Sequence, residues 1–306
     1  MNILLIAGGW SPEREVSLSG ADCIEKALVE RGHRVQRFDP MTDFDRLVER
    51  SRGQDFAFIN LHGSPGEDGL LQAMLDRAGC PYQGSPPAGS FLALNKAAAK
   101  QLFRKAGLPT PDWEFLPVPP DATWQPRIPY PLFVKSNTGG SSLRLGRAND
   151  RATLDRSLAE IFSAGEQAIL EPEIPGREVT CGVLGDEALP PILIEPLAGD
   201  FFDYASKYRN GGARETCPAP LPEPVLERVK TLALEAHVAL GLDGYSRSDF
   251  ILQEQGDLTL LEVNTLPGMT ATSLVPQEAA AVGMGFGELL ERLMELALWR
   301  KKDARP

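Results

Sequence analysis

Residues 260–276, LLEVNTLPGMTATSLVP, combine an apolar strand with polar side chains and a sharp turn. Successive side chains of a strand point to opposite faces, so Glu262 and Asn264 project from the same face. Residues 266–269 then turn through proline and glycine, and Gly268 can bring a backbone N–H close to a ligand. This stretch therefore predicts a strand that presents two oxygen ligands and ends in a ligand-binding turn.

A second apolar strand, GYSRSDFIL, lies just upstream and carries Arg247 and Asp249 on one face. A hairpin turn through residues 254–257 would pair the two strands. Asp249, Glu262 and Asn264 would then converge as three hard oxygen donors, which suit Mg²⁺ held jointly by the protein and nucleotide phosphates. Arg247 would place a fixed positive charge beside them. The alternative is a surface hairpin with scattered acidic residues, and the spacing alone leaves it open.

Length and composition describe a globular protein of two or three domains, with 306 residues, 42% of them hydrophobic and 24% charged. The net charge of −11 argues against a nucleic-acid or anionic-membrane partner, although an anionic small ligand could bind where lysines cluster. No run approaches the roughly 18 apolar residues of a membrane span. MNILLIAGG also lacks the basic flank and cleavage pattern of a signal peptide. We therefore expect a cytoplasmic protein.

The first part of the chain has the strand and helix order of a doubly wound α/β domain. We expect strands over residues 2–7, 34–38 and 55–61, and helices over residues 16–30 and 70–78. The glycine turn after the first strand, GGWSPE, lacks the G-x-G-x-x-G pattern, which argues against a dinucleotide-binding fold and a nicotinamide dehydrogenase.

Two polar loops of this domain, SPEREVS and HGSPGEDG, follow the first and third predicted strands. Ligands of open α/β sheets bind at the carboxyl ends of the strands. Glu13 and His62 lie in these loops and are therefore candidate ligand-binding residues. The alternatives are a helix N-terminal acid for Glu13 and an ordinary turn residue for His62.

The middle of the chain holds three segments that could enclose a nucleotide. Lys135 ends an apolar strand before a glycine and serine loop at residues 139–142, which could close over phosphates as a lid or form an ordinary hairpin. A strand ending at Glu171 and a strand carrying Glu178 could offer a backbone edge to a purine and a carboxylate to a ribose. The aromatic loop over residues 200–217 is too long to be a plain connection and is predicted to be functional.

Taken together, these segments resemble the ATP-grasp superfamily and, within it, the D-alanine:D-alanine ligase family. The most specific motifs are GGWSPEREVSLSG, HGSPGEDG, NKAAAK, FVKSNTGGSS, PGREVT, DYASKY, RSDF and EVNTLPGMTATSLVP. They cover nearly the whole chain in the family's order. The resemblance implies an N-terminal α/β substrate domain, residues 1–87, and two α+β domains, residues 88–175 and 176–306, that clamp ATP. It also implies a homodimer.

The resemblance further implies roles for residues that match the family's motifs. The phosphate-binding lysines are Lys96, Lys135 and Lys207. The adenosine-binding positions are Glu171, Ile174, Glu178, Phe201 and Leu261. The ligands of two Mg²⁺ or Mn²⁺ ions are Asp249, Glu262 and Asn264. The catalytic residues are Glu13, Ser142, Tyr208, Arg247, Gly268 and Ser273, and the remaining substrate-binding residues are His62 and Leu274, again with Lys207. Pro172 departs from the family, which commonly has lysine there.

The implied activity is the ATP-dependent joining of two D-alanine molecules through an acyl phosphate, for peptidoglycan precursor synthesis. Within the family, tyrosine at position 208 goes with dipeptide formation. One alternative is a related ligase whose second substrate is D-lactate, D-serine or another amino acid. Another is a non-catalytic ATP-binding sensor, which should have lost metal ligands, whereas all three are present here.

Overall fold

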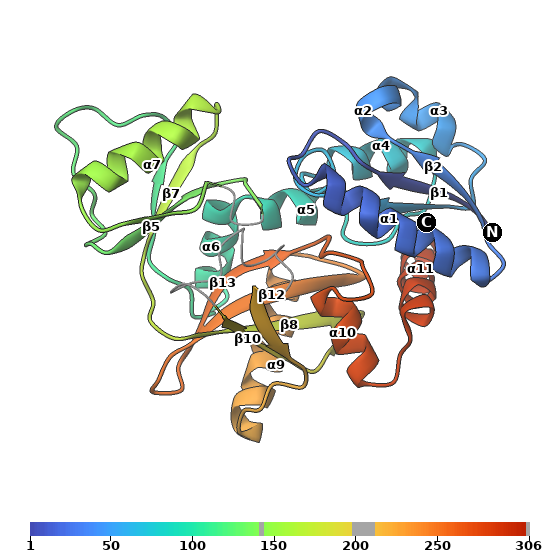
Figure 1. Ribbon diagram of the computed structural model, residues 1–306. Coiled ribbons are helices and arrows are strands. Elements are labelled where there is room, and N and C mark those ends of the chain that lie inside the picture. Colours follow the sequence, from blue (N-terminus) through green and yellow to red (C-terminus); the bar gives the residue numbers. More distant parts are fainter. Residues whose placement is uncertain (141–143, 198–211, 304–306) are drawn as a thin grey trace.

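The computed structural model describes residues 1–140, 144–197 and 212–303. At the N-terminus, the strands β1 (Asn2–Ala7), β2 (Arg34–Phe38) and β3 (Phe56–Asn60) form a parallel sheet in the order β2-β1-β3 (Figure 1). This parallel sheet confirms the predicted α/β class of the first domain. Strand β3 is one residue shorter at each end than the predicted strand over residues 55–61.

Helices cover this parallel sheet and connect its strands. Helix α1 (Arg14–Glu30) contacts all three strands and begins two residues before its predicted start. The short helices α2 (Pro40–Asp43), η1 (Phe44–Arg46) and α3 (Leu47–Ser51) follow β2, and α4 (Leu70–Ala78) follows β3. The last helix, α11 (Phe286–Asp303), packs against α1, so residues from both ends of the chain share one hydrophobic core (Figure 1).

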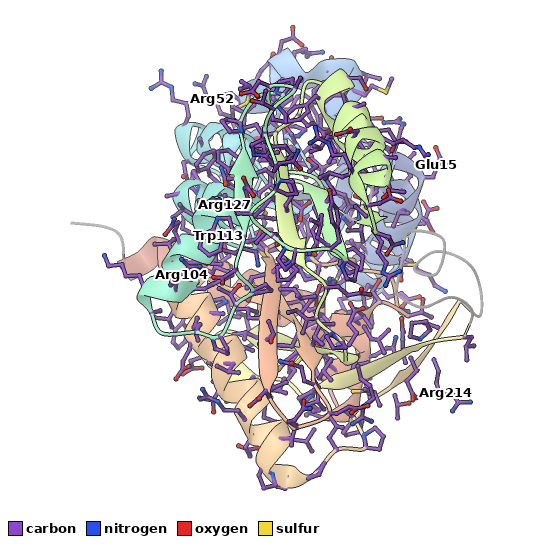
Figure 2. The ribbon with its side chains drawn as sticks, turned by 90° about the vertical axis from the view of Figure 1, so that its left-hand side faces the viewer. Glu15, Arg52, Arg104, Trp113, Arg127 and Arg214 are labelled. Carbon is purple, nitrogen blue, oxygen red and sulfur yellow. The ribbon has the colours of Figure 1, made fainter. Side chains whose placement is uncertain are left out.

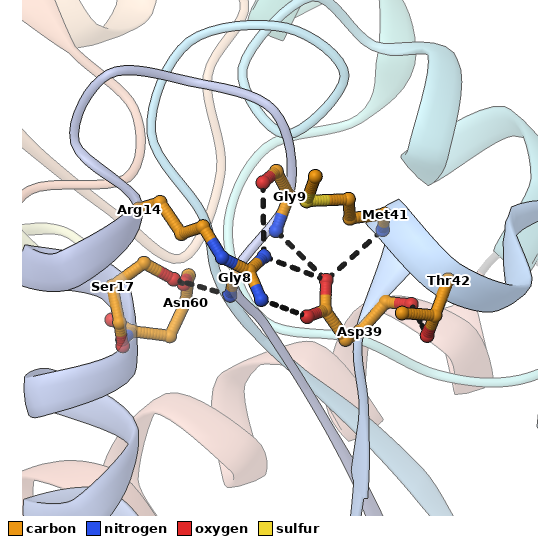
Figure 3. A network of polar contacts seen from close by, with 8 residues as sticks. All are labelled: Gly8, Gly9, Arg14, Ser17, Asp39, Met41, Thr42 and Asn60. Atoms are coloured by element: carbon orange, nitrogen blue, oxygen red, sulfur yellow. Dashed lines mark hydrogen bonds and ion pairs between the residues drawn. The ribbon is translucent and has the colours of Figure 1, made fainter.

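A polar network fixes the loop between β1 and α1 (Figure 3). The Asp39 carboxylate accepts hydrogen bonds from both terminal nitrogens of Arg14, at 3.1 and 2.5 Å, and from the N–H of Gly9 at 3.0 Å. The N–H of Gly8 donates to the Ser17 hydroxyl at 2.8 Å, and that hydroxyl donates to the carbonyl of Asn60. The network ties the carboxyl ends of the three strands together and holds the adjoining loop in place.

The central part of the chain contains two helices and a four-stranded antiparallel sheet. The helices are α5 (Pro87–Leu94) and α6 (Lys96–Lys105), and the Asn95 side chain between them accepts a hydrogen bond from Ala98 N–H and caps α6. The sheet order is β4 (Glu114–Leu116), β7 (Ala168–Pro172), β5 (Leu132–Ser136) and β6 (Gly146–Ala148), and α7 (Arg151–Ser163) packs on it.

Arg104 near the end of α6 holds the segment that leads to β4. Its guanidinium lies 4.2 Å from the ring centre of Trp113 and donates to Asp112 at 2.8 Å (Figure 2). This cation–π contact fastens the segment against the helix. None of the helices in the described part of the chain has the length and apolar character needed to cross a membrane.

The third sheet is antiparallel and has the order β11-β10-β8-β12-β13, with β9 beside β8. Its strands are β8 (Arg177–Leu184), β9 (Glu187–Ala188), β10 (Ile192–Pro196), β11 (Ala213–Thr216), β12 (Tyr245–Leu252) and β13 (Leu258–Asn264). Helix α9 (Glu223–Ala239) contacts β8, β12 and β13 and covers one face. Helix α10 (Leu274–Ala281) contacts β8 and α11.

A β-bulge interrupts the pairing of β12 with β13. Asp249 pairs with Glu262, but the next residue, Phe250, pairs with Leu260, so Leu261 is an extra residue in β13. Leu260 and Val263 are both buried in the core under α9. Leu261 and Glu262 consequently both line the opposite side of the sheet, which strict alternation along the strand does not predict.

The two glycines that flank α4 allow a test of how closely the turn before this helix packs against Pro87. Gly69 and Gly79 flank α4 with positive φ angles of +86° and +72°, but only at Gly69 would a Cβ meet backbone, 2.3 Å from the Pro87 carbonyl oxygen. We expect Gly79→Ala to lower the free energy of unfolding by about 1 kcal/mol and Gly69→Ala by about 3 kcal/mol. Urea unfolding of both variants measures the difference. Equal losses of unfolding free energy would show that the Pro87 backbone moves at little cost to make room for the Cβ at position 69.

Candidate active site

Two adjoining cavities of about 430 and 580 Å³ lie between the three sheets. The first cavity is bordered by Lys135, the turn from β7 to β8 and Leu261. The second cavity is bordered by Glu13, His62 and the turn that follows β13. Both cavities are lined by Lys96, Gly139, Gly140, Glu178, Ile194, Asp249 and Glu262. Because they share these walls, a ligand in one cavity can contact a ligand in the other.

The predicted hairpin of β12 and β13 forms the shared wall. Asp249 lies opposite Glu262, and Arg247 lies opposite Asn264. Asp249, Glu262 and Asn264 all border the second cavity, so the fold brings the three oxygen donors to one place. Asn264 Oδ1 also accepts a hydrogen bond from Leu266 N–H at 2.9 Å, which begins the turn after β13.

Cations balance the two carboxylates of this wall. The Asp249 carboxylate accepts hydrogen bonds from Arg247 Nε and Nη2 at 2.8 and 2.7 Å and from the Thr180 hydroxyl at 2.7 Å. Lys96 Nζ lies 3.1 Å from Glu262 Oε2. Burial would lower the pKa of Arg247, but the charge of Asp249 raises it, so the guanidinium stays protonated.

Glu171 is at the base of the first cavity and contacts two lysines. Its Oε2 lies 2.8 Å from Lys135 Nζ, and its Oε1 lies 3.1 Å from Lys100 Nζ. Burial would raise the pKa of Glu171, but the charges of Lys100 and Lys135 lower it, so the carboxyl is ionised. Ile174 and Glu178 also line this cavity, on the turn and on β8 respectively.

Buried ionisable residues line the second cavity, and two of them, His62 and Glu67, are mainly neutral at pH 7. Glu13 is buried at the N-cap of α1, directly before Arg14. Burial lowers the pKa of His62 more than the charge of Glu13 raises it, and Arg247 lowers it further, so the imidazole is neutral. Burial raises the pKa of Glu67 to about 8, against the hydrogen bond that its carboxyl accepts from Gly63 N–H. Glu67 is therefore mainly protonated at neutral pH.

The turn after β13 supplies the remaining wall of the second cavity. Gly268, Ser273 and Leu274 all line the cavity there. Ser273 Oγ accepts a hydrogen bond from Thr270 N–H at 3.0 Å and lies 2.8 Å from the Thr270 hydroxyl. A Cβ at position 268 would lie 3.1 Å from Ser273 Oγ, so glycine leaves room for this serine at the cavity wall.

Four of the predicted site residues, Ser142, Phe201, Lys207 and Tyr208, lie outside the described residues. The predicted lid over residues 139–142 and the loop over residues 200–217 fall there in part. Within the described residues the loop prediction is wrong over Ala213–Thr216, which form β11 because they pair with β10. Sequence reasoning missed three buried groups, Glu67, Lys100 and Glu278. Two of them had a signal: Lys100 follows Lys96 by four residues in NKAAAK, so the two share a helix face, and Glu67 lies in the polar loop HGSPGEDG.

Comparisons with known proteins agree on one family. The family model described as D-ala D-ala ligase C-terminus matches residues 102–295. A D-alanine–D-alanine ligase of Desulfovibrio desulfuricans is 67% identical over 298 residues, which cover 97% of each chain. The crystal structure of a D-alanine–D-alanine ligase from Bacillus anthracis complexed with ATP is 32% identical, with a TM-score of 0.88 and full coverage of both chains. A D-Ala:D-Ser ligase from Enterococcus faecalis is 27% identical, with a TM-score of 0.81, and covers 97% of this chain and 99% of its own.

Glu278 on α10 provides a test of the electrostatics beside Arg247. It is fully buried, its Oε1 accepts a hydrogen bond from Gly182 N–H at 3.0 Å, and burial raises its pKa to about 8. Because the pKa of Glu278 is higher in the folded state, the folded state binds more protons than the unfolded state between the two pKa values. The stability that protonation of Glu278 contributes is therefore lost as pH rises from the unfolded pKa through 8. The free energy of unfolding of wild type should fall between pH 6 and pH 9, because Glu278 ionises in that range. In Glu278→Gln we expect this fall to be smaller by about 2 kcal/mol.

Urea unfolding of wild type and Glu278→Gln at pH 6 and pH 9 measures this change. Glu254→Gln is the matched control, because Glu254 is exposed in the turn between β12 and β13. A Glu278→Gln protein that loses as much stability as wild type over this range would contradict a protonated Glu278.

Proposed function

Because the chain belongs to the D-alanine–D-alanine ligase family, we propose that it joins two D-alanine molecules at the expense of ATP, for peptidoglycan precursor synthesis. The observation that carries this proposal is the shared wall of the two cavities. The first cavity has lysines together with apolar side chains such as Ile174 and Leu261, and the second has a carboxylate and a guanidinium that suit an amino acid. Asp249 and Glu262 lie where the γ-phosphate of ATP would meet the first D-alanine.

The first step transfers the γ-phosphate of ATP to the carboxylate of the first D-alanine. A carboxylate oxygen forms a bond to phosphorus, the bond to the bridging oxygen of ADP breaks, and an acyl phosphate results. Lys96 and Lys135 line the first cavity and stabilise the charge that spreads over the phosphoryl oxygens. Glu13 would pair with the ammonium group of the first D-alanine in the second cavity.

The second step joins the two amino acids. The amine of the second D-alanine attacks the acyl carbon, loses a proton, and phosphate leaves as the tetrahedral intermediate collapses. Arg247 and the N–H of Gly268 border the same cavity and would donate hydrogen bonds to the oxyanion of that intermediate. Ser273 and Leu274 would bind the carboxylate of the second D-alanine, and His62 lies beside Glu13 as a further substrate contact.

The donor set fits a divalent cation shared with ATP. Two carboxylates and an amide oxygen are the hard ligands that Mg²⁺ or Mn²⁺ prefers, and Asp249, Glu262 and Asn264 would hold two such ions. The described residues contain no group of three His, Cys, Asp or Glu side chains that could hold a metal ion, and the proposed site combines two carboxylates and the Asn264 amide with ATP phosphates. Bound there, the metal ions neutralise phosphate charge.

The remaining assignments are also proposals. The division at residues 87 and 175 is supported by the three sheets, which fall within residues 2–60, 114–172 and 177–264. Glu171, Ile174, Glu178 and Leu261, with Phe201, are the proposed adenosine-binding residues. Lys207 is proposed to bind phosphate and substrate, and Ser142 and Tyr208 are proposed catalytic residues. The cytoplasm, which supplies ATP, is the proposed compartment, and a homodimer is the proposed assembly. We propose no nucleic-acid or membrane partner.

The decisive experiment measures phosphate release from ATP and identifies the product across D-alanine, other D- and L-amino acids and D-lactate. We expect D-alanine to be preferred in both positions, with D-alanyl-D-alanine as product. A ligase with another second substrate is less favoured, since identity is 67% to a D-alanine–D-alanine ligase and 27% to a D-Ala:D-Ser ligase. Preference for D-serine or D-lactate as second substrate would establish that alternative.

Glu262→Gln tests the metal assignment. The change removes a charge opposite Asp249 with little change in volume, so we expect kcat to fall at least about 100-fold at saturating Mg²⁺ while the thermal midpoint stays near that of wild type. Calorimetric titration of Mg²⁺ in the presence of ADP should show weaker binding. Asp257→Asn, at the exposed end of the same hairpin, is the control. Wild-type turnover by Glu262→Gln would refute the assignment.

A further inference from the structure

Lys100 is a buried lysine that contacts Glu171, and Glu171 lines the first cavity, where the nucleotide is proposed to bind. The Lys100 side chain is fully buried, whereas Lys135 and Glu171 line the first cavity. The Glu171 carboxylate lies between the two lysines, 3.1 Å from Lys100 and 2.8 Å from Lys135. Lys96, on the same helix as Lys100, faces Glu262 instead. The described residues thus place two lysines on a single buried carboxylate.

The net charge of the triad of Lys100, Glu171 and Lys135 determines how much positive charge a ligand in the first cavity meets at Lys135. With both lysines protonated, the triad carries one net positive charge, and that charge lies at the cavity with Lys135. Without Lys100, the Lys135 and Glu171 charges would cancel, and a phosphate would meet a neutral ion pair. A unit charge acts over several ångströms in a partly buried site, where the effective dielectric constant is well below that of water.

A second contact fixes the position of the Lys100 side chain. Its Nζ donates to the Thr110 hydroxyl at 3.1 Å, and that hydroxyl donates to the Leu260 carbonyl at 3.0 Å. The Leu260 N–H donates to the Pro109 carbonyl at 2.7 Å. Lys100 therefore links the carboxylate of β7 to β13, directly before the bulge that presents Leu261 and Glu262 to the cavity.

We propose that Lys100 is a positioning residue of the nucleotide site, which offsets the charge of Glu171 and so leaves the positive charge of Lys135 available to the phosphates of ATP. The inference rests on the proposed function, because it takes ATP as the ligand. Burial lowers the pKa of Lys100, whereas the charge of Glu171 opposes that shift. Lys100 acts through Glu171 and contributes to phosphate binding without contacting the nucleotide.

The test compares the affinities of AMP-PNP and adenosine, measured by competition against a fluorescent ADP analogue. The ratio of the two dissociation constants isolates the phosphate contribution, since any change at the adenine affects both ligands. We expect Lys100→Met to raise the AMP-PNP to adenosine ratio of dissociation constants about tenfold. Glu171→Gln should lower this ratio, because both lysine charges then remain. The double variant Lys100→Met/Glu171→Gln should return the ratio to within about threefold of wild type, since its net charge equals that of wild type.

Lys105→Met is the matched control, because Lys105 is exposed on the same helix and should leave the ratio unchanged. An unchanged ratio in Lys100→Met, or a double variant that stays as weak as Lys100→Met, would overturn the inference and leave Lys100 a packing residue. If Lys100→Met does not fold, Glu171→Gln decides alone: a lower ratio supports the inference, and an equal or higher ratio overturns it. A wild-type protein that binds no AMP-PNP would refute the proposed function instead.

Discussion

The pairing of Asp249 with Glu262 across β12 and β13 is the constraint on which the site depends. Two carboxylates on neighbouring strands repel each other unless cations lie close by. Arg247 binds Asp249 from the same strand, and Lys96 reaches Glu262 from α6. The central part of the chain must therefore lie against the third sheet for the hairpin charges to be balanced. A cleft between two sheets, lined by opposite charges, follows from this requirement.

The same electrostatic reasoning extends to the acids around the site. Glu171 is buried and ionised because it contacts Lys100 and Lys135. Glu67 and Glu278 are buried in contact with backbone N–H groups, and burial raises the pKa of each to about 8. Of these three buried carboxyl groups, the one that contacts lysines is ionised, and the two that contact backbone N–H groups are mainly protonated at neutral pH.

The bulge at Leu261 shows where local pattern and tertiary structure diverge. Alternation predicted correctly that Glu262 and Asn264 share a face, and the hairpin through residues 254–257 is present. Strict alternation would put Leu261 on the opposite face from Glu262, but the extra residue in β13 puts both on the cavity side. A bulge depends on the partner strand and on the packing of Leu260 and Val263 under α9, neither of which a strand pattern contains.

Local sequence patterns were enough to predict the order of strands and helices in the first domain, its α/β class and the motifs that identify the family. These features are local, since periodicity and turn residues act within a few positions of the chain. Three features required the folded chain: Lys100 shares Glu171 with Lys135, Glu67 and Glu278 are buried, and Glu13 lines one cavity with the turn after β13. Charge state and burial depend on groups from distant segments, and the chain must fold before those groups can meet.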